Sequence, residues 1–176
     1  MFRLMMLTGQ RRGEVLNIDW TELDRVRSEW LLPAEKSKNG RGHLISLSSE
    51  SRRILDTQAG GKKWPASGLV FRSSRGTRLS GFSKIKRDWD QRIDRKLWAE
   101  DAGSVRFPWR LHDIRRTVAT GMQTLGVRTE VIEAVLNHQS GLRSGLVSTY
   151  QRYDYHVEKA EAMALWGAHV AALTNR

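Results

Sequence analysis

Hydrophobic residues recur every three or four positions in several stretches of the chain, and this spacing predicts amphipathic helices. The clearest example is residues 81–97, whose basic side chains we expect to face outward from an apolar face formed by Phe82, Ile85, Trp89 and Ile93. The same kind of pattern predicts further helices over residues 12–18, 49–58, 112–125, 129–137 with Thr129 as its cap, and 156–173. Helices therefore dominate the predicted architecture.

Two short apolar runs have the character of strands instead. Residues 30–32 and 43–47 are apolar and partly β-branched, and residues 37–42 between them are rich in Gly and Lys. This arrangement predicts a β-hairpin. Residues 62–80 contain Pro, Gly and Ser, and they predict a loop around a short strand at residues 69–71.

The chain begins in an apolar stretch, residues 2–7, without the polar cap that usually starts a helix. We therefore expect that an upstream segment precedes it. The 176 residues are of a size typical of a single domain, so we expect one domain over residues 1–176. The predicted fold class is mainly α with a small antiparallel β-sheet, that is, α+β.

Charge and composition narrow the class of partner. The chain has 30 Lys and Arg against 19 Asp and Glu, a net charge of +11, which favours a polyanion such as nucleic acid. The absence of cysteine excludes disulfides and thiolate metal sites. The first ten residues lack the long apolar region and cleavage site of a signal peptide. We expect a cytoplasmic, nucleoid-associated bacterial protein with no membrane partner.

The first half of the chain carries two candidate phosphate-binding or proton-donating groups. Arg11 follows the Thr8-Gly9 turn at the start of a predicted helix, where backbone amides favour an anion. Lys36 and Lys38 lie in the predicted hairpin beside Asn39, on a tip that can enter a groove of DNA. A lysine there could protonate a leaving oxygen.

The second half carries two histidines, an arginine and a tyrosine in a definite order. His112 and Arg115 are three residues apart, which on a helix places both side chains on one face. His138 follows Asn137, and Tyr150 comes twelve residues later. Taken singly, such residues are most often surface groups or packing residues. Their joint occurrence in one order within a basic chain favours a functional site.

This order resembles the catalytic domain of the tyrosine recombinases of the phage integrase family. That family carries TGxRxxE, a hairpin lysine, HxxR, a Gly-His or Asn-His pair and a tyrosine, and this chain has TGQRRGE, HDIR and Asn-His in the same order. The resemblance covers nearly the whole chain and implies the tyrosine recombinase catalytic-domain fold. It implies six catalytic residues: Arg11, Lys38, His112, Arg115, His138 and Tyr150.

Two of these assignments involve a choice between neighbours. Lys38 is preferred over Lys36 from its distance to the end of the hairpin, which has the sequence ISLS where family members usually have VPLS. Tyr150 is preferred over Tyr153 and Tyr155 because the stretch STYQRYDYHVEKAEAMALW resembles family sequences in which the first tyrosine attacks.

The resemblance also implies the reaction, which is metal-independent cleavage and rejoining of double-stranded DNA through a 3′-phosphotyrosyl intermediate. The two arginines would hold the non-bridging phosphate oxygens through paired hydrogen bonds, which a lysine cannot reproduce. Tyr150 would attack, His112 would assist proton transfer, Lys38 would protonate the leaving 5′ oxygen, and His138 would bind the phosphate. No cofactor is implied, and the full-length protein is expected to act as a homotetramer on paired sites of a prophage or other mobile element.

Three alternatives remain at this point. A type IB topoisomerase shares the catalytic residues but relaxes supercoils as a monomer. An inactive DNA-binding remnant of an integrase would keep the fold without the reaction. A metal-dependent nuclease is less favoured, because His112, Asp113 and His138 do not have the spacing of a recognisable ligand set.

Overall fold

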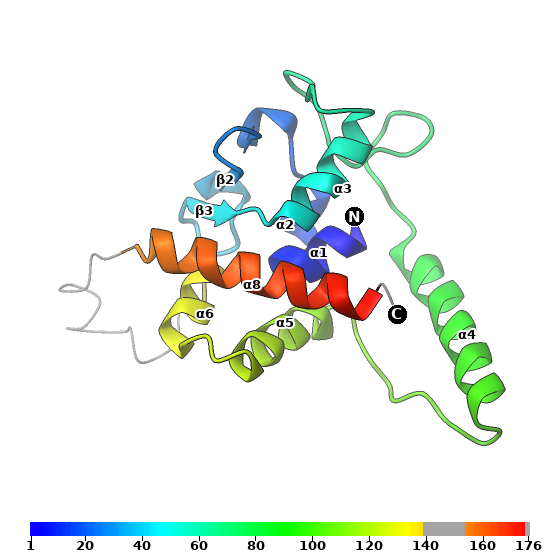
Figure 1. The fold of residues 1–176 in the computed structure, drawn as a ribbon. Helices are drawn as coiled ribbons and strands as arrows, with labels where there is room; N and C mark the ends of the chain where they lie inside the picture. Colours follow the sequence, from blue (N-terminus) through cyan, green and yellow to red (C-terminus); the bar gives the residue numbers. More distant parts are fainter. Residues whose placement is uncertain (139–153, 175–176) are drawn as a thin grey trace. The chain divides into compact units, whose positions relative to one another are not determined.

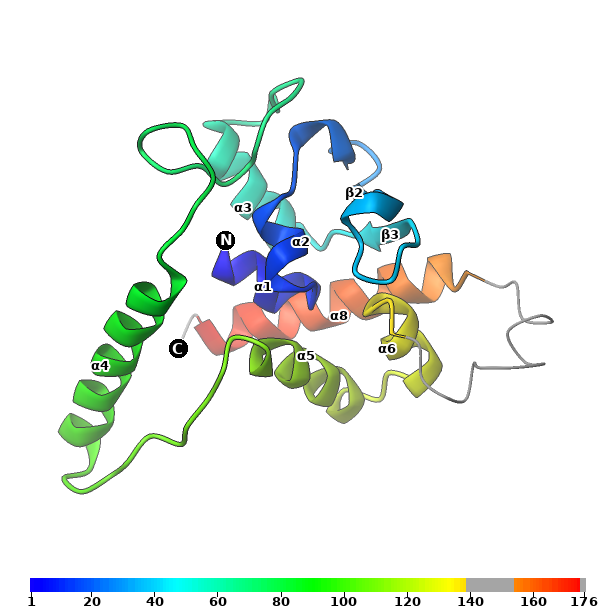
Figure 2. The same cartoon turned by 180° about the vertical axis from the view of Figure 1, so that it is seen from behind.

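The chain forms two compact units, shown from opposite sides in Figures 1 and 2. The first unit comprises Met1–Phe71 and Leu111–Arg176, and the second comprises Arg72–Arg110. The computed structural model describes residues 1–138 and 154–174. All strands and all helices but one belong to the first unit within these described residues.

The described elements confirm a mainly α fold with a small antiparallel sheet. The helices are α1 (Phe2–Thr8), α2 (Arg12–Leu16), α3 (Ser49–Ala59), α4 (Phe82–Glu100), α5 (Asp113–Thr124), α6 (Thr129–Val135) and α8 (His156–Thr174). The strands are β1 (Leu23–Asp24), β2 (Glu29–Leu32) and β3 (His43–Ser46), and the short 3-10 helices are η1 (Trp20–Glu22) and η2 (Ala34–Lys36).

The predicted hairpin is confirmed as β2 and β3, which pair antiparallel with Trp30 opposite Ile45. Side chains alternate along β2, so that Trp30 and Leu32 are buried and Leu31 is exposed. The sequence did not predict β1, which is only two residues long and adds a third strand beside β2. The strand predicted at residues 69–71 is reduced to a single bridge between Leu69 and Asp19, because Asp19 leads directly into η1.

Helix ends explain two further differences from the prediction. Residues 2–8 form α1 although no polar side chain caps it, and its buried face and the left-handed Gly9 at its end (φ 66°) define it instead. Thr129 is the first residue of α6 and not its cap, since the capping position belongs to Arg128 and no side chain bonds the free amides there. The predicted start of α3 is confirmed, because the Ser48 hydroxyl accepts a hydrogen bond from the Ser51 amide.

The core of the first unit forms around α8. This helix packs against α1, α3, α5, α6 and β3, and both views show it crossing the unit (Figures 1 and 2). Met163 and Trp166 are buried, and the Trp166 indole N–H donates to the carbonyl of Met6 at 2.8 Å. Each such large buried side chain contributes roughly 2 to 3 kcal/mol to folding. The helices α1, α5 and α6 and the strand β3 are thereby fixed to one framework.

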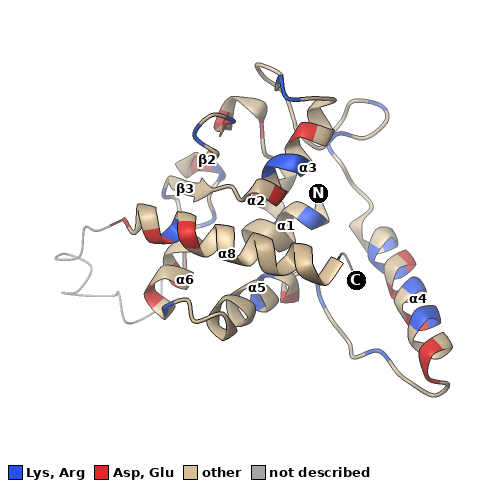
Figure 3. Cartoon of the chain, viewed as in Figure 1, with Lys and Arg blue, Asp and Glu red and all other residues tan. Residues whose placement is uncertain are grey.

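The second unit consists of residues 72–81, the helix α4 and residues 101–110 that follow it. Lys and Arg alternate with Asp and Glu along α4 (Figure 3). Its apolar face is only half buried, and Trp89 stacks on Trp109 with ring centroids 6.5 Å apart. Trp98 is 62% exposed, so this tryptophan does not belong to a core. No helix among the described residues is long and apolar enough to cross a membrane.

Candidate active site

The first unit holds five of the six residues that the sequence singled out. These five are Arg11, Lys38, His112, Arg115 and His138. The sixth, Tyr150, lies outside the described residues. The five come from four separate segments, namely the start of α2, the β2–β3 hairpin, the start of α5 and the end of α6.

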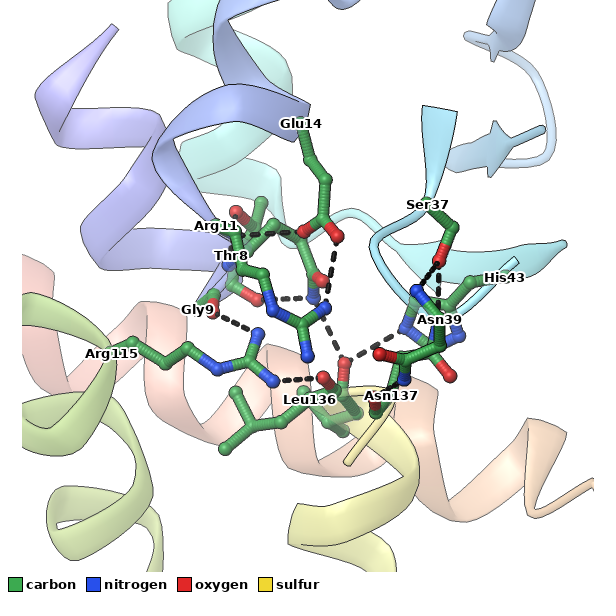
Figure 4. A network of polar contacts seen from close by, with 12 residues as sticks. Thr8, Gly9, Arg11, Glu14, Ser37, Asn39, His43, Arg115, Leu136 and Asn137 are labelled. Carbon is green, nitrogen blue, oxygen red and sulfur yellow. Dashed lines mark hydrogen bonds and ion pairs between the residues drawn. The ribbon is translucent and has the colours of Figure 1, made fainter. Parts of the chain in front are cut away.

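Arg115 is buried in α5 and only 6% exposed. Its Nη1 donates to the carbonyl of Gly9 at 3.0 Å, and its Nη2 donates to the carbonyl of Leu136. Gly9 ends α1 and Leu136 ends α6, so the guanidinium joins the ends of two helices (Figure 4). Carbonyls at helix ends lack partners within the helix, which makes them natural acceptors for this cation. The plane of the guanidinium is therefore fixed before any ligand binds.

Arg11 precedes α2 and is held by Glu14. The Arg11 backbone N–H donates to Glu14 Oε2 at 2.8 Å, and Arg11 Nη1 donates to Oε1 at 2.9 Å. The amide that the sequence suggested for an anion is thus occupied by a carboxylate of the chain itself. What remains for a ligand is the rest of the Arg11 guanidinium, which is part-exposed.

The two guanidinium groups lie next to one another (Figure 4), and the Glu14 carboxylate that bonds Arg11 also acts on Arg115 through its charge. Burial and, to a smaller extent, the charge of Arg11 lower the pKa of Arg115 to about 10, while Glu14 acts in the opposite direction. Arg115 still carries its proton at neutral pH. Two positive charges against one negative charge leave an excess that an anion would neutralise. We call Arg11 and Arg115 the arginine pair.

The last carbonyls of α6 accept hydrogen bonds from distant segments. The carbonyl of Val135 accepts from Gln10 Nε2 at 2.9 Å and from His43 Nε2, also at 2.9 Å. Burial lowers the pKa of His43 to about 4, so this imidazole is neutral at physiological pH and donates through its Nε2–H. The turn after α1 and the start of β3 are thus tied to the same helix end.

The next two carbonyls continue this pattern. Leu136 accepts from Arg115, and the carbonyl of Asn137 accepts from Asn39 Nδ2 at 2.6 Å. Four side chains from four segments therefore satisfy three consecutive carbonyls at the end of α6. His138 follows immediately, with its backbone N–H bonded to the carbonyl of Glu133 at 2.9 Å.

The segment between β2 and β3 carries two lysines, Lys36 at the end of η2 and Lys38 in the hairpin tip, which comprises residues 37–42. Lys36 bonds Glu22 and donates to the carbonyl of Asn17 at 3.1 Å. Glu22 also accepts from the Trp30 indole, so Lys36 belongs to a structural cluster. Lys38 is exposed, and the residues on either side of it are buried or half-buried.

The two histidines are exposed at helix ends. His112 occupies the capping position of α5, one turn from the buried Arg115, and His138 follows the end of α6. Exposure leaves both rings accessible to a ligand. Among the described residues, no group of three His, Asp or Glu side chains could hold a metal ion.

The sequence did not single out several residues that support this site. Glu14 lies in the TGQRRGE motif, three residues after Arg11, and that spacing is the signal that could have identified it. Gln10, Asn39 and His43 contact carbonyls more than 90 residues away in sequence. No local pattern indicates such contacts.

Comparison with solved structures supports the fold. The integrase from mycobacterium phage Brujita matches with a TM-score of 0.59 and 16% identity, over 94% of this chain and 51% of that chain. XerA recombinase matches with a TM-score of 0.53 and 20% identity, over 98% of this chain and 56% of that one. At these identities the likeness shows the fold alone, and it confirms the expected recombinase fold.

Two named proteins with similar sequences are also integrases. The prophage integrase IntA of Escherichia coli K12 is 28% identical over 175 residues, which are 98% of this chain and 38% of that protein. The integrase of Salmonella phage P22 is 29% identical over 132 residues, which are 72% of this chain and 32% of that protein. The chain thus spans well under half the length of these relatives. The model of the phage integrase family matches residues 1–157, a range that includes all six candidate residues, and the chain therefore belongs to the phage integrase family.

Proposed function

We propose that this chain is the catalytic part of a tyrosine-type site-specific recombinase that cuts and rejoins double-stranded DNA through a 3′-phosphotyrosyl intermediate. The arginine pair carries this proposal. Two neighbouring guanidinium groups, one fixed by helix-end carbonyls and one by Glu14, suit the non-bridging oxygens of a phosphodiester. The named relatives, which are integrases, support the same reaction.

A phosphodiester gathers negative charge as a fifth oxygen approaches its phosphorus. Fixed positive charge placed there in advance stabilises that transition state without reorganisation, and one such donor typically contributes about 100- to 1,000-fold in rate. Arg115 meets this requirement because burial and two carbonyl contacts fix its position. The proposed reaction therefore relies on arginines and requires no metal ion.

In the proposed step, the Tyr150 hydroxyl oxygen forms a bond to phosphorus while the bond from phosphorus to the 5′ oxygen breaks. The phenolic proton passes to His112, and a proton from the Lys38 ammonium passes to the departing 5′ oxygen. His138 donates a hydrogen bond to a non-bridging oxygen. Rejoining reverses these transfers with a 5′-hydroxyl from another strand, so no external energy source is required.

The described contacts support two of the choices made from sequence. Lys36 is engaged by Glu22, which leaves Lys38 as the proton donor of the hairpin tip. Tyr155 packs against the hydrophobic cluster that includes Met163 and Trp166, which favours Tyr150 over Tyr155 as the nucleophile.

We further propose that both compact units form one catalytic domain, and that the full-length protein acts as a homotetramer on paired DNA sites. Its place of action would be the bacterial cytoplasm, at the nucleoid. The excess of 30 basic over 19 acidic residues supports binding to the DNA backbone.

A suicide-substrate assay tests the reaction. The chain is incubated with a library of nicked duplexes, from which the short 5′-hydroxyl fragment diffuses away after cleavage and leaves the enzyme attached to DNA. We expect a slower-migrating band on a denaturing gel, unchanged by chelator and absent in Tyr150→Phe. A band that persists in Tyr150→Phe, or that disappears with chelator, would contradict the proposal.

A further inference from the structure

Asn137 ends α6 in a backbone conformation that is uncommon for a residue with a side chain. Its φ is 46°, and the amides of Asn137 and His138 bond the carbonyls of Ala134 and Glu133. This pattern is the helix-ending motif in which glycine is usual and asparagine is the occasional substitute. The backbone alone therefore explains a glycine at position 137, and the asparagine side chain requires a further reason.

That side chain reaches the hairpin tip. Asn137 Nδ2 donates to the Ser37 hydroxyl oxygen at 3.2 Å, and Asn39 Nδ2 donates to the Asn137 carbonyl at 2.6 Å (Figure 4). The Asn39 backbone N–H also donates to the same Ser37 oxygen at 3.4 Å. These contacts among Ser37, Asn39 and Asn137 form what we call the asparagine clasp. Lys38 lies between its two hairpin members, and His138 directly follows its third.

We propose that the asparagine clasp positions Lys38 for proton donation, so that Ser37, Asn39 and Asn137 are positioning residues of the cleavage step. This inference rests on the proposed function of Lys38. The tip contains Gly40 and Gly42, which allow many backbone conformations, and the lysine side chain has four freely rotating bonds. The clasp removes the backbone part of this freedom and ties the proton donor to the helix end that also carries His138 and bonds Arg115.

The clasp does not require burial of Lys38 itself. Ser37 is buried and Asn39 half-buried, while Lys38 remains exposed and free to contact DNA. Loss of the clasp should therefore leave the arginine pair in place and affect only the delivery of the proton. This selectivity distinguishes a positioning role from a general contribution to folding.

The test compares cleavage rates on two matched suicide duplexes. One carries the ordinary phosphodiester, and the other carries sulfur in place of the 5′ bridging oxygen, because a thiolate leaves without needing a proton. Asn137→Gly removes the amide but accepts the left-handed backbone without strain. Ser37→Ala removes the same hydrogen bond from the other side. Asn17→Gly is the control, because the Asn17 side chain bonds its own helix at the Gly13 carbonyl.

We expect Asn137→Gly and Ser37→Ala to slow cleavage of the ordinary duplex roughly 10-fold to 100-fold, as misplaced catalytic groups do. The sulfur-containing duplex should be cleaved at the rate of the unaltered chain, and Asn17→Gly should match the unaltered chain on both. Adding Asn137→Gly to Lys38→Met should cause no further loss, because both changes remove the same proton transfer.

Equal slowing on both duplexes would overturn the proposal, since the clasp would then act on folding or phosphate binding. Losses that multiply in the double variant would overturn it as well. Failure of the proposed function has a different signature, in which Lys38→Met is itself slowed equally on both duplexes or not slowed at all. Urea unfolding of each variant checks that the chain remains folded.

Discussion

The arginine pair and the hairpin tip are held in opposite ways. Arg115 is buried, and its guanidinium donates hydrogen bonds to two helix-end carbonyls. Lys38 is exposed, and the residues before and after it, Ser37 and Asn39, bond Asn137 at the end of α6. A group that supplies fixed charge benefits from a rigid, dry position, whereas a group that must give up a proton and contact DNA needs access to the ligand. Changes to the first region should therefore affect both stability and cleavage, and changes to Lys38 should affect cleavage alone.

The largest effect is expected at the buried arginine. Arg115→Lys retains a positive charge, but a lysine ammonium cannot bond two carbonyls and a phosphate at once as the planar guanidinium does. Formation of the covalent adduct should therefore fall by about 1,000-fold. The matched control is Arg116→Lys, because Arg116 is exposed on the same helix and pairs with Asp113. If the Arg115→Lys chain forms adduct at the rate of the control, the arginine pair is not required for cleavage.

A pair of lysine changes separates cleavage from stability. Lys38→Met should reduce adduct formation by about 100-fold, as expected for loss of a general acid, and leave the urea unfolding midpoint unchanged. Lys36→Met should leave Glu22 buried without its cation, lowering the free energy of unfolding by about 1 to 3 kcal/mol. Cleavage by the folded Lys36→Met chain should be normal. The reverse pattern would assign the proton donor to Lys36.

Gly9 tests how closely the arginine region is packed. Its φ is 66°, and an added Cβ would lie 2.6 Å from Leu136 Cδ2 and 3.1 Å from Val118 Cγ1. Gly9→Ala should therefore lower the free energy of unfolding by about 2 kcal/mol and weaken cleavage, because Arg115 bonds the Gly9 carbonyl. Gly13→Ala is the control, since nothing lies within 4 Å of its added Cβ. Equal urea midpoints for the two variants would contradict this packing.

His43 gives the smallest expected effect, at the base of the hairpin. The folded chain keeps this imidazole neutral down to about pH 4, whereas an unperturbed histidine binds its proton near pH 6.5. The free energy of unfolding should therefore decrease as the pH falls through this window, by about 1 to 1.5 kcal/mol between pH 7.5 and 5.5. In His43→Gln, whose amide can still donate to Val135, urea unfolding should lose this component. An unchanged pH dependence would show that His43 is not its source.

Local patterns predicted most of the fold, because helix periodicity and the hairpin depend on nearby residues. The helix predicted over residues 49–58 agrees to within one residue with α3, which is capped by Ser48 and Gly60. The sequence did not predict α1, whose buried face packs mainly against α3, α5 and α8, which are distant from it in the sequence. It also missed β1, because two residues are too few to show an alternation.

The candidate site was likewise predictable only where it depends on local sequence. The order of residue types indicated Arg11, Lys38 and Arg115, but it could not show that Arg115 would be buried against carbonyls of two other helices. Nor could it explain why asparagine precedes His138, because the partner of that side chain lies 100 residues away. Long-range hydrogen bonds depend on tertiary packing, which no local pattern encodes.

The most direct test of the central claim is to identify the amino acid that carries DNA in the trapped adduct. The chain is reacted with suicide duplexes in the presence of chelator and digested with protease and nuclease, and the nucleotide-bearing peptide is sequenced by mass spectrometry. We expect one 3′-linked nucleotide on Tyr150, lost in Tyr150→Phe and strongly reduced in Arg115→Lys. A nucleotide on Tyr153, on Tyr155 or on a residue other than tyrosine, or a 5′ linkage, would contradict it.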